Sequence, residues 1–363
     1  DHGHNTSLRH KQFCYEGGML VPLIIKGNHP TISPGRVVND LVTLLDVGAT
    51  TLALAGAELP NYLEGQNLFG SEYKAAEYVF GARDRCDYTI DRIRTVRSDR
   101  YRYIRNYYLE RSLMQPGYRD DRPPSKDMRR LFEAGELTAY QAEHWFGLRP
   151  REELYDMEKD PDSIDNLIDN PEYTEVIKHM RSNLRSWQEE VFDTGMLPES
   201  EMVKLAAQNN TTIYQVARDR SLYNLPQLLD AADLALEENE TNLKALRSLL
   251  KSPDLGLRYW GIVGCFLLND TQSAFTCLED DSHEVRAMAG WLLLRSGNKK
   301  IGLQCLEQLL KENSYATLSV LNIIDWAEED AKPLLPTVKA LKLKNYEEKM
   351  QLHLLAKHKG TDF

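Results

Sequence analysis

The amino-acid sequence predicts an α/β domain with a small antiparallel sheet in its later part, followed by an all-α solenoid of short helical repeats. Three observations support this prediction. Residues 19–25 form an apolar run with the length of a buried strand. Residues 93–107 alternate between apolar and polar side chains, which is typical of a half-buried β-hairpin. After residue 198, apolar residues recur at three- and four-residue steps almost to the C-terminus.

Length and composition indicate a globular protein of two domains, which we place at residues 1–198 and 199–363. The chain has 363 residues, of which 42% are hydrophobic and 27% are charged. The formal net charge of −11 argues against nucleic acid as the main partner. No apolar run approaches the roughly 20 residues of a membrane span. The five cysteines show no C-x-x-C spacing, so we expect free thiols rather than a zinc site or a disulfide framework.

The first domain begins with a predicted strand and a predicted helix. The strand covers residues 19–25, and Pro22 would place it at a sheet edge or a bulge. Leucine and alanine spacing over residues 37–55 indicates a helix, with an interruption possible at Gly48. Gly56 is a suitable stop for this helix.

Three further segments complete this domain. The hairpin of residues 93–107 is expected to turn at Ser98-Asp99. Residues 108–150 are polar and rich in arginine and proline, which predicts a long surface loop. An amphipathic helix is expected to start at Pro171, to be capped by Asn170 and to end by Gly195.

The second domain contains a weak internal repeat. Residues 250–261 can be laid over residues 278–289, so that Arg258 matches Arg286 at an offset of 28 residues. In both segments an acidic turn precedes an apolar residue and this arginine, and residues 303–327 keep the leucines but lose the arginine. The pattern resembles HEAT-type repeats in a shorter, degenerate form, and such repeats stack into a solenoid.

The first three residues, Asp1-His2-Gly3, suggest a metal site. A carboxylate and a neutral imidazole at a strand end can face one divalent ion, and oxygen-rich sites favour Ca²⁺ or Mg²⁺. Two ligands cannot hold an ion alone, so others must come from elsewhere. The alternative is that Asp1 caps a turn and His2 is an ordinary surface residue.

Lys11 is the candidate for binding an anion. Its ammonium group is a compact charge that could neutralise a tetrahedral oxyanion, and Arg9 and His10 extend the positive patch. His10 is therefore a second candidate for contact with the substrate. Gly17-Gly18 would let the backbone come close to an anion or make a sharp turn into the next strand. The alternative is a solvated basic loop.

Arginine and tyrosine are frequent between Arg83 and Tyr107, and this stretch has two interpretations. The arginines could line a groove for a polyanion such as a sulfated glycan. They could instead lie on the wet face of a strand pair and bind nearby aspartates, which we favour because charged residues are usual there. Trp145, in the predicted surface loop, is a candidate for stacking on a sugar.

The order of several short motifs resembles the second half of type I sulfatases, which belong to the alkaline-phosphatase-like superfamily. The similarity covers residues 1 to about 195. The motifs, in chain order, are Asp1-His2-Gly3, Lys11, Tyr15-Glu16-Gly17-Gly18, Leu54-Ala55-Gly56 with Pro60, Gly65-Gln66-Asn67-Leu68, Arg102-Tyr103-Ile104-Arg105, and Glu153-Leu154-Tyr155-Asp156 with Asn166-Leu167. Each is short, and the shared order is what carries the resemblance.

The resemblance implies an alkaline-phosphatase-like α/β fold and a role for each candidate residue. Asp1 and His2 would complete a Ca²⁺ site, and Lys11 would contact the sulfate. The nucleophile of the family is a formylglycine made in a C/S-x-P-x-R motif, which this chain lacks. We therefore expect the nucleophile upstream of Asp1 and expect this chain alone to be catalytically incomplete.

The function expected from this resemblance is hydrolysis of sulfate esters or N-sulfate, with a sulfated glycan or small molecule as the substrate. A phosphatase or phosphonate hydrolase of the same superfamily is an alternative, because the same metal and lysine suit phosphate. A non-catalytic scaffold, in which the helical repeats bind a protein partner, is the alternative from another class. The resemblance also implies a periplasmic or secreted protein.

Overall fold

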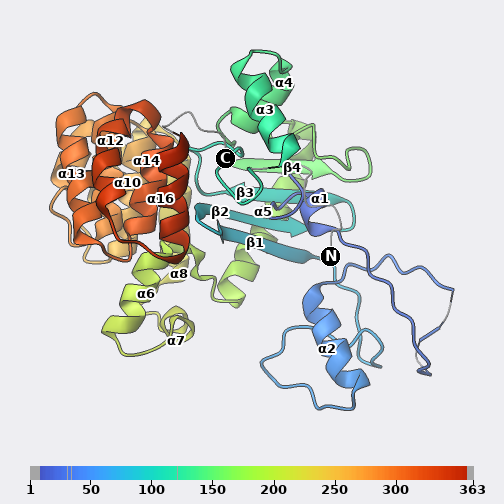
Figure 1. Ribbon diagram of the computed structural model, residues 1–363. Helices are drawn as coiled ribbons and strands as arrows, with labels where there is room; N and C mark the ends of the chain where they lie inside the picture. The colour runs from blue at the N-terminus through green and yellow to red at the C-terminus, as the bar shows by residue number, and fades with distance from the viewer. Residues whose placement is uncertain (1–8, 31, 34, 121, 358–363) are drawn as a thin grey trace. The chain divides into compact units, whose positions relative to one another are not determined.

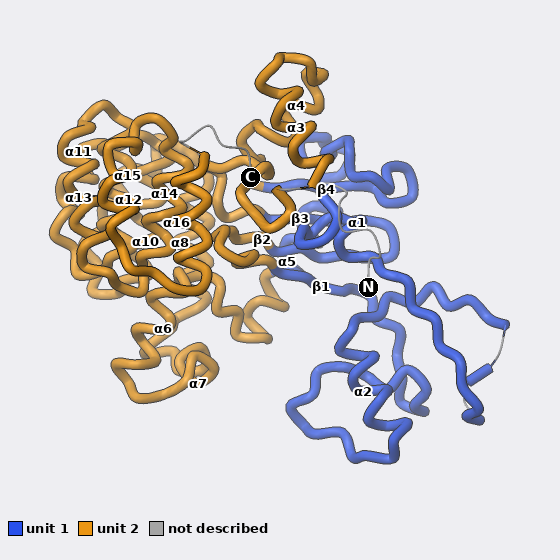
Figure 2. The backbone as a smooth tube through the Cα atoms, in the orientation of Figure 1, with its two compact units in different colours: residues 1–82, 94–105, 152–184 blue, residues 83–93, 106–151, 185–363 orange. Residues whose placement is uncertain are grey.

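The structure is a computed structural model that describes residues 9–30, 32–33, 35–120 and 122–357 (Figure 1). The chain divides into two compact units, each assembled from separate stretches of sequence (Figure 2). Unit 1 contains residues 1–82, 94–105 and 152–184, and unit 2 contains residues 83–93, 106–151 and 185–363.

A four-stranded sheet with strand order β1-β2-β3-β4 confirms the predicted small antiparallel sheet. Its strands are β1 (Val79–Cys86), β2 (Thr89–Arg97), β3 (Tyr101–Asn106) and β4 (Glu152–Asp156). The predicted hairpin is β2 and β3, whose turn is closed by a hydrogen bond of 2.9 Å from Ser98 N to Tyr101 O. β3 pairs antiparallel with β4, with Tyr103 opposite Leu154. The sequence pattern missed β1, because charged residues interrupt its alternation.

The buried strand predicted at residues 19–25 is wrong for this structure. Helix α1 (Glu16–Met19) occupies the start of this segment, and residues 20–25 adopt no regular structure. Their apolar side chains are exposed: 68% of Leu20 and 91% of Ile24 are accessible to solvent. A strand is stable only when a neighbouring strand satisfies its backbone groups, and none of the strands β1–β4 continues the sheet to this segment.

Helix α2 (Leu44–Leu54) confirms the helix predicted in this region but begins later than the predicted residue 37. A capping box sets its start, because the Asp46 carboxylate accepts a hydrogen bond of 2.7 Å from Thr43 N. The helix continues through Gly48 without interruption. Gly56 adopts φ +73° just after the helix, which confirms it as the stop.

The amphipathic helix predicted from Pro171 is also confirmed. The short helix η1 (Pro171–Tyr173) leads into α5 (Thr174–Glu190), and the Asn170 side chain accepts a hydrogen bond of 3.0 Å from Glu172 N as the predicted cap. The regular helix ends at Glu190, and the short helix η2 (Thr194–Met196) contains Gly195.

Residues 108–150 are not the structureless loop that the sequence predicts. They contain α3 (Pro123–Glu133) and α4 (Ala139–Phe146). Phe132 of α3 and Phe146 of α4 stack with ring centroids 3.8 Å apart, so the two helices pack against each other. Trp145 is 9% exposed, which leaves little of its ring available for stacking on a sugar.

From residue 199 onward the chain is helical, which confirms the predicted all-α character of this part. The helices are α6 (Glu199–Gln208), α7 (Ile213–Arg218), α8 (Leu225–Leu236), η3 (Glu240–Asn242), α9 (Leu243–Leu249), α10 (Leu255–Leu267), α11 (Thr271–Thr276), α12 (His283–Arg295), α13 (Lys299–Glu312), α14 (Thr317–Trp326), η4 (Glu328–Leu334), α15 (Leu335–Ala340) and α16 (Asn345–Lys357). In the described part of the chain, no helix combines the length and apolarity needed to cross a membrane.

The two segments of the sequence repeat occupy equivalent places in unit 2. Arg258 is the fourth residue of α10 and Arg286 is the fourth residue of α12. Each pairs with a carboxylate further along the chain, Asp280 at 2.8 Å and Glu312 at 2.6 Å. Helix α10 packs against α12, α12 against α14, and α14 against α16.

The core of unit 2 includes residues on both sides of the predicted domain boundary at 198. Trp260 is fully buried and donates a hydrogen bond of 2.9 Å from Nε1 to Met196 O. The hydroxyl group of Tyr223 donates to Asp193 O at 2.6 Å. All five cysteines are free thiols, as predicted.

Candidate functional site

The predicted anion-binding residues His10 and Lys11 lie in a tight loop just before α1. The loop is closed by a hydrogen bond of 3.0 Å from Phe13 N to His10 O. Arg9 and Gln12 flank the pair with φ values of 59° and 81°, in the left-handed region that non-glycine residues rarely adopt. Both His10 and Lys11 are half-buried. The backbone therefore fixes the point from which the Lys11 side chain extends.

Two glycines allow this loop to fold back on α1. A Cβ atom at Gly17 would lie 2.6 Å from Nε2 of His10, and one at Gly18 would lie 2.2 Å from Phe13 O. A side chain at position 18 would displace the loop, because it would overlap backbone oxygens, whereas a side chain at position 17 would require the His10 ring to move. The backbone of the glycine pair lies close to the His10 loop, which the sequence did not predict. The predicted close approach to an anion stays a prediction, and the predicted sharp turn into a strand is wrong, because residues 20–25 form no strand.

A buried cluster of four side chains anchors the start of the loop to β4 and the chain after it. The Arg9 guanidinium lies 3.6 Å from the centroid of the Tyr15 ring and donates to Ser163 O at 3.0 Å. The Glu153 carboxylate accepts from the hydroxyl of Tyr15 at 2.9 Å and from that of Tyr155 at 2.6 Å. Burial and the Glu153 charge raise the pKa of Tyr15, so its hydroxyl remains a donor at neutral pH.

Glu16 fastens the first turn of α1 to the hairpin of β2 and β3. Its carboxylate lies 2.6 Å from Nη2 of Arg102 and 3.3 Å from Nε of Arg97. Burial opposes ionisation of Glu16, but the two guanidinium groups more than offset it and lower the pKa of this carboxyl. The loop that carries Lys11 is thus held at both ends by buried polar contacts.

This arrangement can present one ammonium group, with an imidazole beside it, to a tetrahedral anion. Charged donors held in place before the anion arrives stabilise developing negative charge without reorganisation. The predicted metal ligands, Asp1 and His2, lie outside the described residues. Within the part of the chain that the structure describes, no group of three or more histidine, cysteine, aspartate or glutamate side chains could hold a metal ion.

The arginine-rich stretch does not form an open groove for a polyanion. Its arginines pair with carboxylates, as in the interpretation that we favoured, but most are buried instead of lying on a wet face: Arg83, Arg92, Arg94, Arg102 and Arg105 are each less than 9% exposed. Of the expected partners Asp84, Asp87, Asp91 and Asp99, Asp91 and Asp84 do pair with arginines of this stretch. Asp91 pairs with Arg83 at 3.0 Å, but the Arg100 partner is Asp156, at 2.6 Å.

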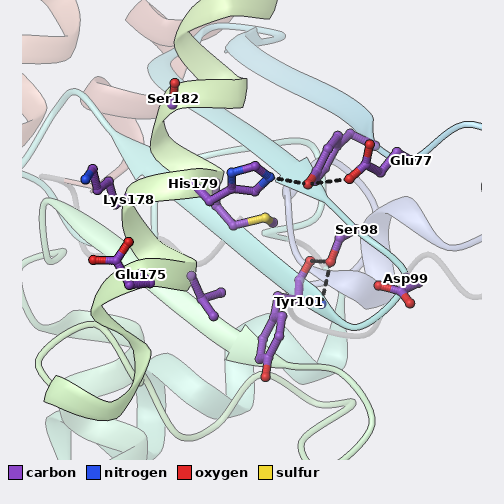
Figure 3. A pocket seen from close by; sticks show the side chains of 11 residues that line it. Glu77, Ser98, Asp99, Tyr101, Glu175, Lys178, His179 and Ser182 are labelled. Carbon is purple, nitrogen blue, oxygen red and sulfur yellow. Dashed lines mark hydrogen bonds between the residues drawn. The ribbon is translucent and has the colours of Figure 1, made fainter.

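Unit 1 contains a cavity of about 620 Å³ that the sequence did not predict (Figure 3). It lies between the residues before β1, the turn from β2 to β3, and helix α5. Its lining residues are Glu77, Tyr78, Ser98, Asp99, Tyr101, Glu175, Val176, Lys178, His179, Met180 and Ser182. No sequence signal could have found it, because three segments far apart in the chain supply its walls.

The Lys11 loop lies in a part of the chain that is similar to known sulfatases. Residues 4–143 match the family described as "N-sulphoglucosamine sulphohydrolase, C-terminal". An "Ulvan-active sulfatase" of Formosa agariphila is 35% identical over 219 residues, which cover 58% of this chain and 36% of the relative. The "N-sulphoglucosamine sulphohydrolase" of Homo sapiens is 25% identical over 202 residues, which cover 49% of this chain and 38% of the relative.

A solved structure described as a 2-O GAG sulfatase shares 25% identity over 45% of this chain and 29% of its own, with a TM-score of 0.31. This score is too low to add to the sequence similarity. The chain spans little more than a third of the length of the two relatives above, 36% and 38%. Residues 4–143 are therefore similar to the C-terminal domain of sulfatases, and these relatives are sulfatases.

Proposed function

We propose that this chain is the C-terminal part of a sulfatase that hydrolyses sulfate esters or N-sulfate groups of a sulfated glycan. The observation that supports this most directly is the match of residues 4–143 to the C-terminal sulfatase domain, with Lys11 inside the match. The names of two relatives, an ulvan-active sulfatase and an N-sulphoglucosamine sulphohydrolase, support a saccharide as the substrate.

Lys11 is the residue to which we assign contact with the sulfate group, with His10 as a second contact. Cleavage of a sulfate ester places negative charge on the non-bridging and leaving oxygens, and a fixed ammonium group stabilises that charge. The tight loop and the glycine pair support this role because they fix the backbone of both residues.

We further propose that Asp1 and His2 contribute to a Ca²⁺ site. A carboxylate oxygen suits this hard ion, and further oxygen ligands must come from residues outside this pair. When bound, the ion would polarise the sulfate oxygens. The formylglycine nucleophile implied by the resemblance is not encoded here, because the chain lacks the C/S-x-P-x-R motif.

The test is the activity of the complete enzyme that contains this chain. Lys11→Ala should lower kcat for sulfate release from a sulfated disaccharide by about 100-fold, the usual effect of losing one charged contact in the transition state. Lys26→Ala is the matched control, because Lys26 is an exposed lysine outside the loop, and it should leave kcat unchanged. Equal kinetics of the two variants would remove Lys11 from the site. Faster release of phosphate than of sulfate would indicate the phosphatase alternative.

We propose that the helices after residue 198 form a HEAT-like solenoid domain. The equivalent places of Arg258 and Arg286 in α10 and α12, and the side-by-side order of α10, α12 and α14, support this.

We also propose a periplasmic or secreted location, which the resemblance to sulfatases supports. Cell fractionation tests it, and recovery of the protein only with cytosolic markers would contradict it.

A further inference from the structure

We propose that the cavity lined by β2–β3 turn residues and α5 is a binding site for an uncharged sugar unit. Its volume of about 620 Å³ lies within the roughly 300–1,000 Å³ of small-molecule sites. Figure 3 shows its residues converging from two sides, with α5 on one and the strand segments on the other. The Tyr101 ring and the apolar side chains of Val176 and Met180 supply the apolar wall that the carbon-bound face of a sugar ring needs.

A hydrogen-bonded chain of three side chains sets the polar side of this cavity. The Tyr78 hydroxyl donates to Oε1 of Glu77 at 3.0 Å, and the Tyr78 hydroxyl oxygen lies 2.8 Å from Nε2 of His179. Because the Tyr78 proton is committed to Glu77, the hydroxyl oxygen accepts from Nε2–H of His179. This arrangement fixes the tautomer of His179 and leaves Nδ1 as an acceptor in the neutral ring.

The remaining polar groups offer both kinds of hydrogen bond that a sugar hydroxyl makes. The carboxylates of Asp99 and Glu175 can accept, and the Lys178 ammonium group can donate. A hydroxyl group donates one hydrogen bond and accepts others, so a wall with both donors and acceptors suits a polyol better than an ion.

The charge of the cavity argues against a sulfated ligand. Glu77, Asp99 and Glu175 carry three formal negative charges, against one positive charge on Lys178. A sulfate group would face this net negative charge at short range, which is unfavourable. The cavity therefore suits an unsulfated unit of a glycan, in contrast to the basic loop around Lys11.

This inference rests on the proposed function only for the expectation that the natural ligand is a glycan. None of the lining residues belongs to the Lys11 loop, so sugar binding can be measured without any sulfatase activity. Failure of the binding test would leave the sulfatase proposal intact, and loss of the sulfatase proposal would leave a sugar-binding site.

The experiment is saturation-transfer NMR on the full chain with four neutral disaccharides: cellobiose, maltose, lactose and N,N′-diacetylchitobiose. We expect at least one to receive saturation from the protein and expect glucose 6-sulfate to bind at least fivefold more weakly. Glu175→Ala and Lys178→Ala should each lower, at least fivefold, the affinity for the disaccharide that binds. Glu190→Ala is the matched control, because Glu190 is an exposed glutamate on the same helix outside the cavity.

Three results would overturn the proposal. The first is no saturation transfer to any of the four disaccharides. The second is an equal loss of affinity in Glu175→Ala and Glu190→Ala, and the third is binding of glucose 6-sulfate as tight as that of the neutral sugars. Circular dichroism of each variant shows whether it is folded. Glu175 and Lys178 are both exposed, so their removal is expected to leave the fold intact.

Discussion

Replacement of Glu16 by alanine should destabilise unit 1 by about 3 kcal/mol, the lower end of the effect of breaking a buried ion pair. Arg102, whose side chain is 4% exposed, would keep its position but lose its charge partner. It donates to Oε2 of Glu16 from both Nη2 and Nε, at 2.6 and 3.0 Å. Arg97 is 13% exposed and its contacts with Glu16 are longer, at 3.3–3.4 Å, so the loss of these contacts contributes little to the destabilisation.

The appropriate assay is native-state amide hydrogen exchange on peptides from β3, read by mass spectrometry. Tryptophan fluorescence would miss the effect, because all five tryptophans lie in unit 2. A loss of about 3 kcal/mol corresponds to roughly 100-fold faster exchange of the β3 amides. Glu172→Ala, which removes an exposed carboxylate in the same unit, is the control and should change exchange by less than about twofold.

A double variant separates the charge effect from simple loss of packing. Glu16→Ala combined with Arg102→Met removes the carboxylate and its more buried partner, so Arg102 is not left as an unpaired buried charge, and the double variant should recover most of the lost protection. Exchange in Glu16→Ala that matches the Glu172→Ala control would refute the reasoning. So would a double variant that is less protected than Glu16→Ala alone.

Two further predictions concern unit 2. Burial raises the pKa of Glu284 from 4.5 to about 7, so the folded protein holds a proton on this carboxyl that the unfolded chain releases. The free energy of unfolding should therefore fall by about 3 kcal/mol as pH rises from about 4.5 to 7. Glu284→Gln should remove this slope, raising the urea midpoint at pH 8 and leaving it nearly unchanged at pH 4; an unchanged midpoint at pH 8 would contradict the shift. A fragment of residues 199–363 should give a helical far-UV circular dichroism spectrum, and a spectrum without helix would show that the boundary at 198 is wrong.

Local patterns in the sequence were sufficient to predict the elements that are stabilised by residues close to them in the chain. The hairpin of β2 and β3, the stop at Gly56 and the cap at Asn170 follow from alternation, backbone conformation and a side chain bonded two residues away. The glycine pair at residues 17–18 indicated a close approach of the backbone, but residue type alone did not show that the group approached is the His10 loop.

Elements that depend on distant partners were mispredicted or missed. Residues 19–25 have the composition of a buried strand, but no strand of the sheet pairs with them, so residues 20–25 are irregular and mostly exposed. The arginines of β2 and β3 look like residues of a wet face, because alternation cannot show that Glu16 and Glu152 approach them from other elements.

By itself, the sequence determined the helical character of the C-terminal part, the central hairpin and the position of Lys11 ahead of a glycine pair. Only the tertiary structure decided which carboxylate neutralises which arginine, that Tyr15 and Tyr155 share Glu153, and that three separate segments line the cavity beside His179. The reason is physical. Turns and caps are stabilised by neighbours in the chain, whereas buried charge pairs and cavities depend on residues that only folding brings together.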